Sequence, residues 1–187
     1  MKIRSFIAIN LDETIKEKLK NIENSFREAL PKSKIKWVKK DNFHITLRFL
    51  GDINQEDIPK IEDTIGEFAQ ECSAFTIDFH EVGVFPGIRR PRVLWIGGDY
   101  SDIFRDFYTG FNLKLESIGF PEDKPFLPHI TFGRIKYIPE REVKILKELI
   151  DEARFNYKET VTHIDLMRSQ LKPEGPIYTV IKTFYLK

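Results

Sequence analysis

The sequence carries the tripeptide His-Ile-Thr twice, with histidines at His44 and His129 and threonines at Thr46 and Thr131. Each copy lies in an apolar run, "FHITLRFLG" or "FLPHITFGR", that predicts a buried strand. Alternate residues of a strand share a face, so each histidine should project beside its threonine. A lone copy is typical of an ordinary strand, but the duplication favours a shared chemical role.

Two imidazoles suit phosphodiester chemistry without a metal ion. Groups with ordinary pKa values of about 6.5 can serve at neutral pH as one base and one acid. In phosphodiester transesterification or hydrolysis, one takes the proton of the attacking oxygen and the other protonates the leaving oxygen. Threonine hydroxyls and an arginine can hold the non-bridging oxygens. Because the two motifs are nearly symmetric, the residues alone do not tell which histidine is the acid.

Other catalytic classes have weaker support. Each His-x-Thr motif offers a single zinc ligand, and no cluster of Cys, His or carboxylates stands beside either copy. No Gly-x-Ser-x-Gly occurs, and Cys72 lacks a motif neighbour. His80 and His163 lie in strand-like runs without a hydroxyl two residues on, which indicates ordinary polar-face residues. We therefore expect no metal and no cofactor.

Two arginines follow the motifs closely. Arg48 shares the face of the first histidine by simple alternation, whereas Phe49 is expected on the opposite, core side. Arg134 falls on the wrong face by the same rule, unless a bulge or strand end near Gly133 reverses the alternation. Either arginine could clamp a phosphate through charge-assisted hydrogen bonds.

Basic and aromatic residues gather in three further stretches. "FPGIRRPR" contains Arg89, Arg90 and Arg92, "KIKWVKK" surrounds Trp37 with lysines, and "KPEGPIY" ends in Tyr178. Cations interleaved with rings suit single-stranded RNA, whose phosphates meet the cations while its bases stack on the rings. Short basic runs are equally typical of a solvated surface, and the rings could instead pack in the core.

In these flanks, the two motifs resemble those of the two-histidine (2H) phosphoesterase superfamily. The stretches "RSFIAI", "WVKKDNFHITLRFLG", "RPRVLWIG", "PHITFGR" and "EGPIY" look closest to its RNA 2′,3′-cyclic phosphodiesterase branch, also called 2′-5′ RNA ligases. They occur in that branch's order and approximate spacing, so the resemblance covers nearly the whole chain. Phe132 stands where the family more often has an aliphatic residue, which is a harmless departure.

The resemblance implies metal-free opening of a terminal 2′,3′-cyclic phosphate to a 2′-phosphate. It implies that His44 is the proton donor to the leaving 3′ oxygen, that His129 is the proton acceptor from water, and that Thr46, Thr131 and Arg134 bind the phosphate. RNA, single-stranded or with tRNA-derived ends, is the expected partner, and reverse 2′-5′ joining follows from microscopic reversibility. A small cyclic nucleotide as substrate, and a non-catalytic module that binds RNA ends, stay open as alternatives.

The order strand, helix, His-Ile-Thr strand, helix, strand occurs twice. "FIAINLD" at 6–12 and "VLWIGGD" at 93–99 both end in an Asp that can cap a helix. The two halves, about 1–85 and 86–187, predict an α+β fold of two pseudo-symmetric lobes in one domain over 1–187, with possible strand exchange at the ends. Each lobe should have an antiparallel-rich sheet with helices on its outer face, and the cleft should lie between the lobes. The resemblance implies the same bilobed fold.

Apolar residues three or four positions apart predict four helices, over about 15–30, 58–68, 103–118 and 140–153. Each helix should turn its apolar face to a sheet. Ile103 is expected to begin the inward face of the third helix.

Composition limits the remaining possibilities. Lys and Arg total 30 against 29 for Asp and Glu, so the overall charge gives no sign of a polyanion binder. No apolar run approaches the roughly 20 residues that span a bilayer, and the first residues become charged too soon for a signal peptide. The single cysteine makes no internal disulfide. We expect a cytoplasmic monomer without membrane contact.

Overall fold

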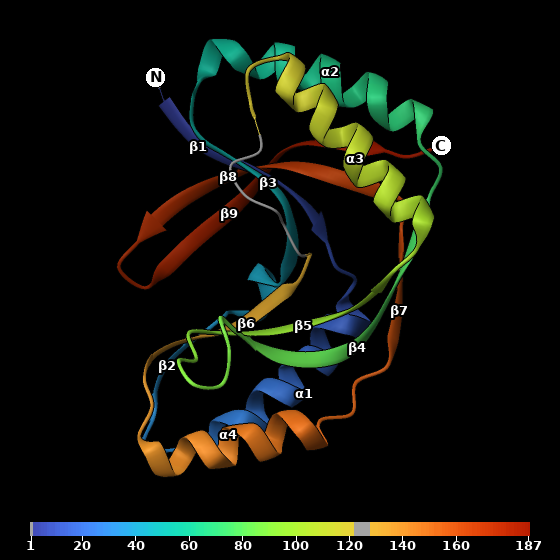
Figure 1. Cartoon of the computed structure of the whole chain (residues 1–187). Coiled ribbons are helices and arrows are strands. Elements are labelled where there is room, and N and C mark those ends of the chain that lie inside the picture. The colour runs from blue at the N-terminus through green and yellow to red at the C-terminus, as the bar shows by residue number, and fades with distance from the viewer. Residues whose placement is uncertain (1, 122–127) are drawn as a thin grey trace.

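The computed structural model describes residues 2–121 and 128–187. In these residues the chain forms nine strands and four α-helices (Figure 1). The strands are β1 (Lys2–Asn10), β2 (Lys34–Trp37), β3 (His44–Asn54), β4 (Phe75–Phe85), β5 (Val93–Tyr100), β6 (Ile130–Tyr137), β7 (Tyr157–Val161), β8 (His163–Lys172) and β9 (Gly175–Tyr185). The helices are α1 (Glu13–Ala29), α2 (Ile58–Glu71), α3 (Asp102–Ser117) and α4 (Glu140–Glu152). The predicted start of the second His-Ile-Thr strand, 126–127, lies outside the described residues.

The strands form one sheet in the order β7-β4-β5-β6-β3-β1-β8-β9, and β2 pairs with β6. Every ladder in the described part of the chain is antiparallel. The sheet curls between two pairs of helices (Figure 1). β3 joins β6 through the pair Ile45 and Ile130. On one side of this junction lie β1, β8 and β9, and on the other lie β2, β4, β5 and β7, so each side draws strands from both halves of the sequence.

Helix α1 begins at an Asp cap, as its sequence predicts. The Asp12 carboxylate accepts a hydrogen bond from the backbone N–H of Ile15 at 2.9 Å. Its apolar stripe, including Leu19 and Phe26, is buried. The ring of Phe26 meets Phe132 of β6 edge-on at 5.4 Å, so α1 lies against β6 beside α4.

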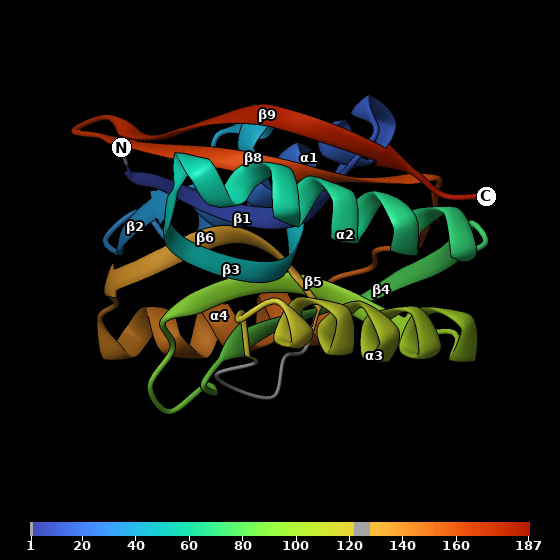
Figure 2. The same cartoon turned by 90° about the horizontal axis from the view of Figure 1, so that it is seen from above.

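Helices α2 and α3 lie side by side (Figure 2), at the end of the molecule opposite α1 and α4 (Figure 1). Phe68 of α2 packs on Phe107 and Phe111 of α3, with ring centroids 5.5 and 6.2 Å apart. The prediction that Ile103 points inward is wrong, because its side chain is 57% exposed while Phe104 is buried. The inner face of α3 therefore begins one residue later than the spacing of apolar residues indicated.

The predicted fold class is confirmed: an antiparallel sheet is covered on its outer faces by four helices, in an α+β arrangement (Figure 1). Among the described residues, no helix has both the length and the apolar character needed to cross a membrane.

Glu159 on β7 is a buried carboxylate beside the cap of α1. Its side chain is 7% exposed, and its Oε2 has no hydrogen-bond partner among the described residues. Burial raises the pKa of Glu159 to about 7, and the negative charge of Asp12 acts in the same direction. Because the pKa is higher in the folded than in the unfolded protein, the free energy of unfolding decreases as pH rises from the ordinary value of 4.5 to about 7.

Replacing this carboxyl by an amide should remove the pH-dependent penalty. We expect Glu159→Gln to raise the free energy of unfolding at about pH 8 by at most about 3 kcal/mol, and to raise it little near pH 4, since one pKa unit corresponds to about 1.4 kcal/mol. Urea unfolding at both pH values measures the difference. Glu148→Gln, on the exposed side of α4, is the control. An equal gain at both pH values would contradict the assignment.

Candidate active site

Both His-Ile-Thr motifs line one cavity of about 550 Å³. His44 and Thr46 come from β3, Thr131 comes from β6, and His129 immediately precedes β6. The sequence prediction that the two pairs face a common cleft agrees with this placement.

The junction between β3 and β6 explains why the four side chains meet. Ile45 and Ile130 are register partners, and both are fully buried against the helix side of the sheet. Because neighbouring residues of a strand point to opposite faces, the residues on either side of each isoleucine turn to the concave face. The same pairing therefore brings the two motifs side by side.

Two hydrogen bonds fix the ring of His44. Its Nδ1 lies 2.7 Å from the backbone carbonyl oxygen of Asn42, and because a carbonyl only accepts, Nδ1 carries the hydrogen. Its Nε2 lies 3.0 Å from the hydroxyl oxygen of Thr46. In the neutral ring, Nε2 accepts the hydrogen bond that the hydroxyl donates. Nε2 is therefore the ring nitrogen that can gain or lose a proton, and it lies beside Thr46.

Aromatic rings partly bury this imidazole, which also lines the cavity. The ring centroids of Phe6 and Tyr178 lie 5.1 and 5.2 Å from that of His44, and the two aromatic rings lie 5.0 Å from each other. Burial lowers the pKa of His44 to about 4. The charges of Arg134 and His129 also lower it, while the hydrogen bond to the carbonyl described above opposes the change. His44 is therefore neutral near pH 7 in the free protein.

His129 also packs against a ring. Phe85 of β4 meets it edge-on with centroids 5.1 Å apart, and Phe85 itself stacks on Trp95 at 4.9 Å with the planes 20° apart. Trp95 lies close over Gly83, where a Cβ atom would come within 2.3 Å of the indole. The aromatic wall beside His129 thus requires a glycine at position 83.

Arg134 reaches the cavity through a bulge. Leu94 pairs with Gly133 and Trp95 with Thr131, so Phe132 is an extra residue in the β5–β6 ladder. The extra residue reverses the alternation, and Arg134 lines the same cavity as the histidines. Of the two conditions under which Arg134 could reach the cleft, a bulge or a strand end near Gly133, the bulge is the one present.

A second bulge makes the prediction for Arg48 wrong. Ala8 pairs with Thr46 and Ile7 with Arg48, so the ladder between β1 and β3 contains one extra residue. Arg48 therefore turns to the helix side, where it is 7% exposed and donates a hydrogen bond to Asn112 of α3.

Phe49 also lies on the face opposite to the predicted one, but it turns toward the cavity and not toward the helices. It was expected in the core, but it lines the cavity and is 67% exposed. It pairs with Phe6 of β1, whose side chain also faces the cavity. The bulge that precedes Phe49 in β3 gives it this orientation, and a second bulge follows it.

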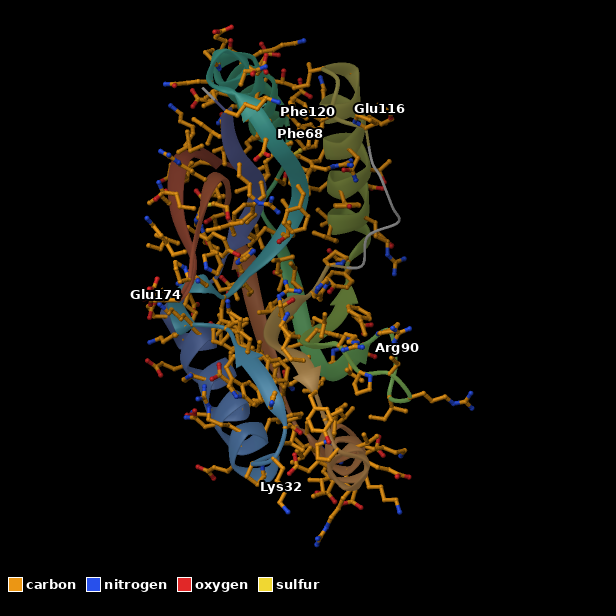
Figure 3. The ribbon with its side chains drawn as sticks, turned by 90° about the vertical axis from the view of Figure 1, so that its left-hand side faces the viewer. Lys32, Phe68, Arg90, Glu116, Phe120 and Glu174 are labelled. Carbon is orange, nitrogen blue, oxygen red and sulfur yellow. The ribbon has the colours of Figure 1, made fainter. Side chains whose placement is uncertain are left out.

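The loop arginines lie outside the cavity lining. Arg89, Arg90 and Arg92 are exposed between β4 and β5, and Figure 3 places Arg90 across the open side of the molecule from Glu174, at the tip of the β8–β9 hairpin. Trp37 does line the cavity, and the Arg27 guanidinium lies 5.3 Å from the centre of its ring. These four candidates stay predictions as RNA contacts.

Sequence reasoning missed several neighbours of the motifs. Phe6, Arg4 and Lys36 line the cavity, and strand alternation in 2–10 could have placed the first two on one face. Asn42 contributes its backbone carbonyl, and a contact made by the backbone cannot be predicted from the type of residue.

The other histidines stand apart. Neither His80 nor His163 lines the cavity; each lies 3.8 Å from a carboxylate, of Asp99 and Asp165 respectively. In the part of the chain that the structure describes, no three His, Cys, Asp or Glu side chains come together in a group that could hold a metal ion.

The geometry agrees with comparisons to known proteins. The family described as LigT like Phosphoesterase matches residues 9–95 and 104–178, which include both motifs and Arg134. The chain belongs to this family. The predicted membership of the two-histidine phosphoesterases is thereby confirmed, as is the prediction of an enzyme.

Relatives in this family match over their whole length. The chain is 33% identical to the RNA 2′,3′-cyclic phosphodiesterase of Methanothermobacter thermautotrophicus, with 100% of both chains covered. It is 36% identical to the protein of the same name from Archaeoglobus fulgidus, over 97% of this chain and 99% of that one.

Solved structures show the same fold. TT0787 of Thermus thermophilus superposes with a TM-score of 0.84 at 29% identity, covering 98% of each chain. Escherichia coli LigT complexed with 3′-AMP superposes with a TM-score of 0.78 at 25% identity, covering 100% of this chain and 99% of that one.

The burial of His44 leads to a direct prediction. In an NMR titration, His44 should titrate at about pH 4, and Tyr178→Ala should move its pKa toward 6.5, because water replaces the ring that excludes it. Tyr178→Phe keeps the ring and should leave the pKa low. If the alanine and phenylalanine variants titrate alike, the ring of Tyr178 does not set the pKa.

Proposed function

We propose that the protein is an RNA 2′,3′-cyclic phosphodiesterase that opens a terminal cyclic phosphate to a 2′-phosphate without a metal ion. The observation that carries the proposal is the meeting of two His-Thr pairs and Arg134 around one cavity. The relatives that match the chain over its full length carry the same activity in their names.

The hydrolysis needs one proton removed and one supplied. A water oxygen forms a bond to phosphorus as the bond from phosphorus to the 3′ oxygen breaks. His129 accepts the proton of the water, and His44 donates a proton to the 3′ oxygen. Arg134 and the hydroxyls of Thr46 and Thr131 hold the non-bridging oxygens, on which negative charge increases in the transition state. Nothing in this scheme needs an ion beyond these side chains.

A proton donor must carry a proton, whereas His44 is neutral near pH 7 in the free protein. Lowering its pKa from 6.5 to about 4 disfavours the charged form by about 3 kcal/mol. A phosphate charge about 4 Å from the ring contributes about 4 kcal/mol in the other direction at an effective dielectric constant of about 20. The substrate's own charge is therefore sufficient to protonate the ring as it binds.

Further assignments belong to the same proposal. The substrates are RNA ends, single-stranded or derived from tRNA, and the protein acts on them as a cytoplasmic monomer. If the 5′-hydroxyl of a second RNA takes the place of water, its oxygen forms the bond to phosphorus as the bond to the 3′ oxygen breaks. The same two histidines then accept and donate the protons, and the product is a 2′-5′ linkage with a free 3′-hydroxyl. Four cations lining the cavity, Arg4, Lys36, Lys39 and Arg134, support an anionic substrate longer than a single nucleotide.

The first test is an assay on an oligoribonucleotide that ends in a 2′,3′-cyclic phosphate, with EDTA present. We expect a 2′-phosphate as the product, and His44→Ala and His129→Ala should each reduce kcat at least about 100-fold, because each removes a general acid or base. Exposed His80→Ala is the matched control. Turnover that requires added metal, or an unchanged substrate, would refute the proposed function.

The second test assigns the proton donor. Sulfur in place of the 3′ oxygen makes a leaving group that needs no proton, so the defect of His44→Ala should shrink by at least about 10-fold with the sulfur substrate. The defect of His129→Ala should remain, because water still has to lose its proton. Rescue of the His129 variant instead would reverse the two roles.

A further inference from the structure

The two walls of the cavity differ in chemistry. On the concave face of β3, β1, β8 and β9, the register aligns Phe49 with Phe6, Phe6 with Met167, and Met167 with Val180. These four apolar residues form one row across the strands, here called the apolar row. Phe6 and Met167 belong to a hydrophobic cluster separate from the main core, with Tyr178 packed against it.

The apolar row ends in an exposed ring. Its middle members are buried, but Phe49 is 67% exposed inside the cavity wall, with its ring centroid 6.1 Å from that of Phe6. The bulge that precedes it in β3 turns this phenylalanine out of the core. A large apolar side chain exposed in a cavity beside catalytic groups is typical of a ligand contact.

The facing wall is cationic. Lys36 of β2 and Arg134 of β6 are register partners, and both line the cavity. Lys39 lines it as well. The wall formed by the apolar row has one cation, Arg4, and the facing wall has three, together with the rings of Trp37 and Phe85. Rings predominate on the first wall and charges on the second, which suits the bases and the phosphates of a nucleic acid respectively.

We propose that the base of the nucleotide bearing the cyclic phosphate stacks on Phe49, and that this contact sets affinity for nucleotide ends of any base. The inference rests on the proposed function and assigns the base subsite of that same cavity. Thr46 and Phe49 are three residues apart on a bulged strand, at most roughly 10 Å, so a nucleotide whose phosphate contacts the Thr46 hydroxyl can reach the ring of Phe49 with its base. Phe49 makes no hydrogen bond through its side chain, so it selects for a flat ring and not for a particular base.

The test combines substrate and protein variants. One oligoribonucleotide ends in an ordinary nucleotide with a cyclic phosphate, and the other ends in a base-free anhydroribitol with the same cyclic phosphate. We expect Phe49→Ala to raise KM for the first substrate about 10- to 100-fold with little change in kcat, and to leave KM for the second unchanged. Phe49→Tyr keeps the ring and should behave as the parent protein.

Controls separate this inference from folding and from the proposed function. Tyr137→Ala truncates a ring on β6 that is 55% exposed and does not line the cavity, so it should affect neither substrate. An equal effect of Phe49→Ala on both substrates, or no effect on either, would overturn the assignment of Phe49. Failure of the parent protein to hydrolyse either substrate would instead refute the proposed function.

Discussion

The pairing of Ile45 with Ile130 is the contact on which the site depends. It joins β3 to β6, and both side chains are completely buried on the helix side. Burying an isoleucine contributes about 1.5–3 kcal/mol, whereas turning His44 or Thr46 into that core would leave polar groups without partners. The orientation of the motifs is therefore fixed by the residues between their histidines and threonines. This is why a short duplicated pattern can specify a site assembled from distant segments.

Strand alternation could be predicted from the sequence only as far as the first bulge. His44 and Thr46 precede the extra residue of β3, and their predicted face is the observed one. Arg48 and Phe49 follow it, and their predicted faces are reversed. A bulge depends on which strand lies alongside and in what register, which a local pattern does not contain. Gly133 was informative because glycine itself marks a place where a ladder can be irregular.

The spacing of apolar residues predicted which face of a helix is buried, but it did not predict which elements the helix packs against. The stripe on α1 that includes Leu19 and Phe26 is buried as expected. Its position beside α4, with α3 beside α2, depends on how the strands cross in the sheet. The two helices that follow β1 and β5 thus lie at opposite ends of the molecule (Figure 1). Long-range order of this kind follows from the whole set of strand pairings and not from any one segment.

The two motifs are alike, but their surroundings are not, and this difference matters for their chemistry. His44 is enclosed by Phe6 and Tyr178 and bound to a backbone carbonyl, whereas His129 meets the edge of Phe85. Two identical imidazoles in identical settings would share protons equally, and acid–base catalysis requires one to hold a proton while the other does not. The duplicated sequence supplies the two groups. Burial between Phe6 and Tyr178 keeps His44 neutral in the free protein, so the proposed role of this ring as proton donor depends on the charge of the bound substrate.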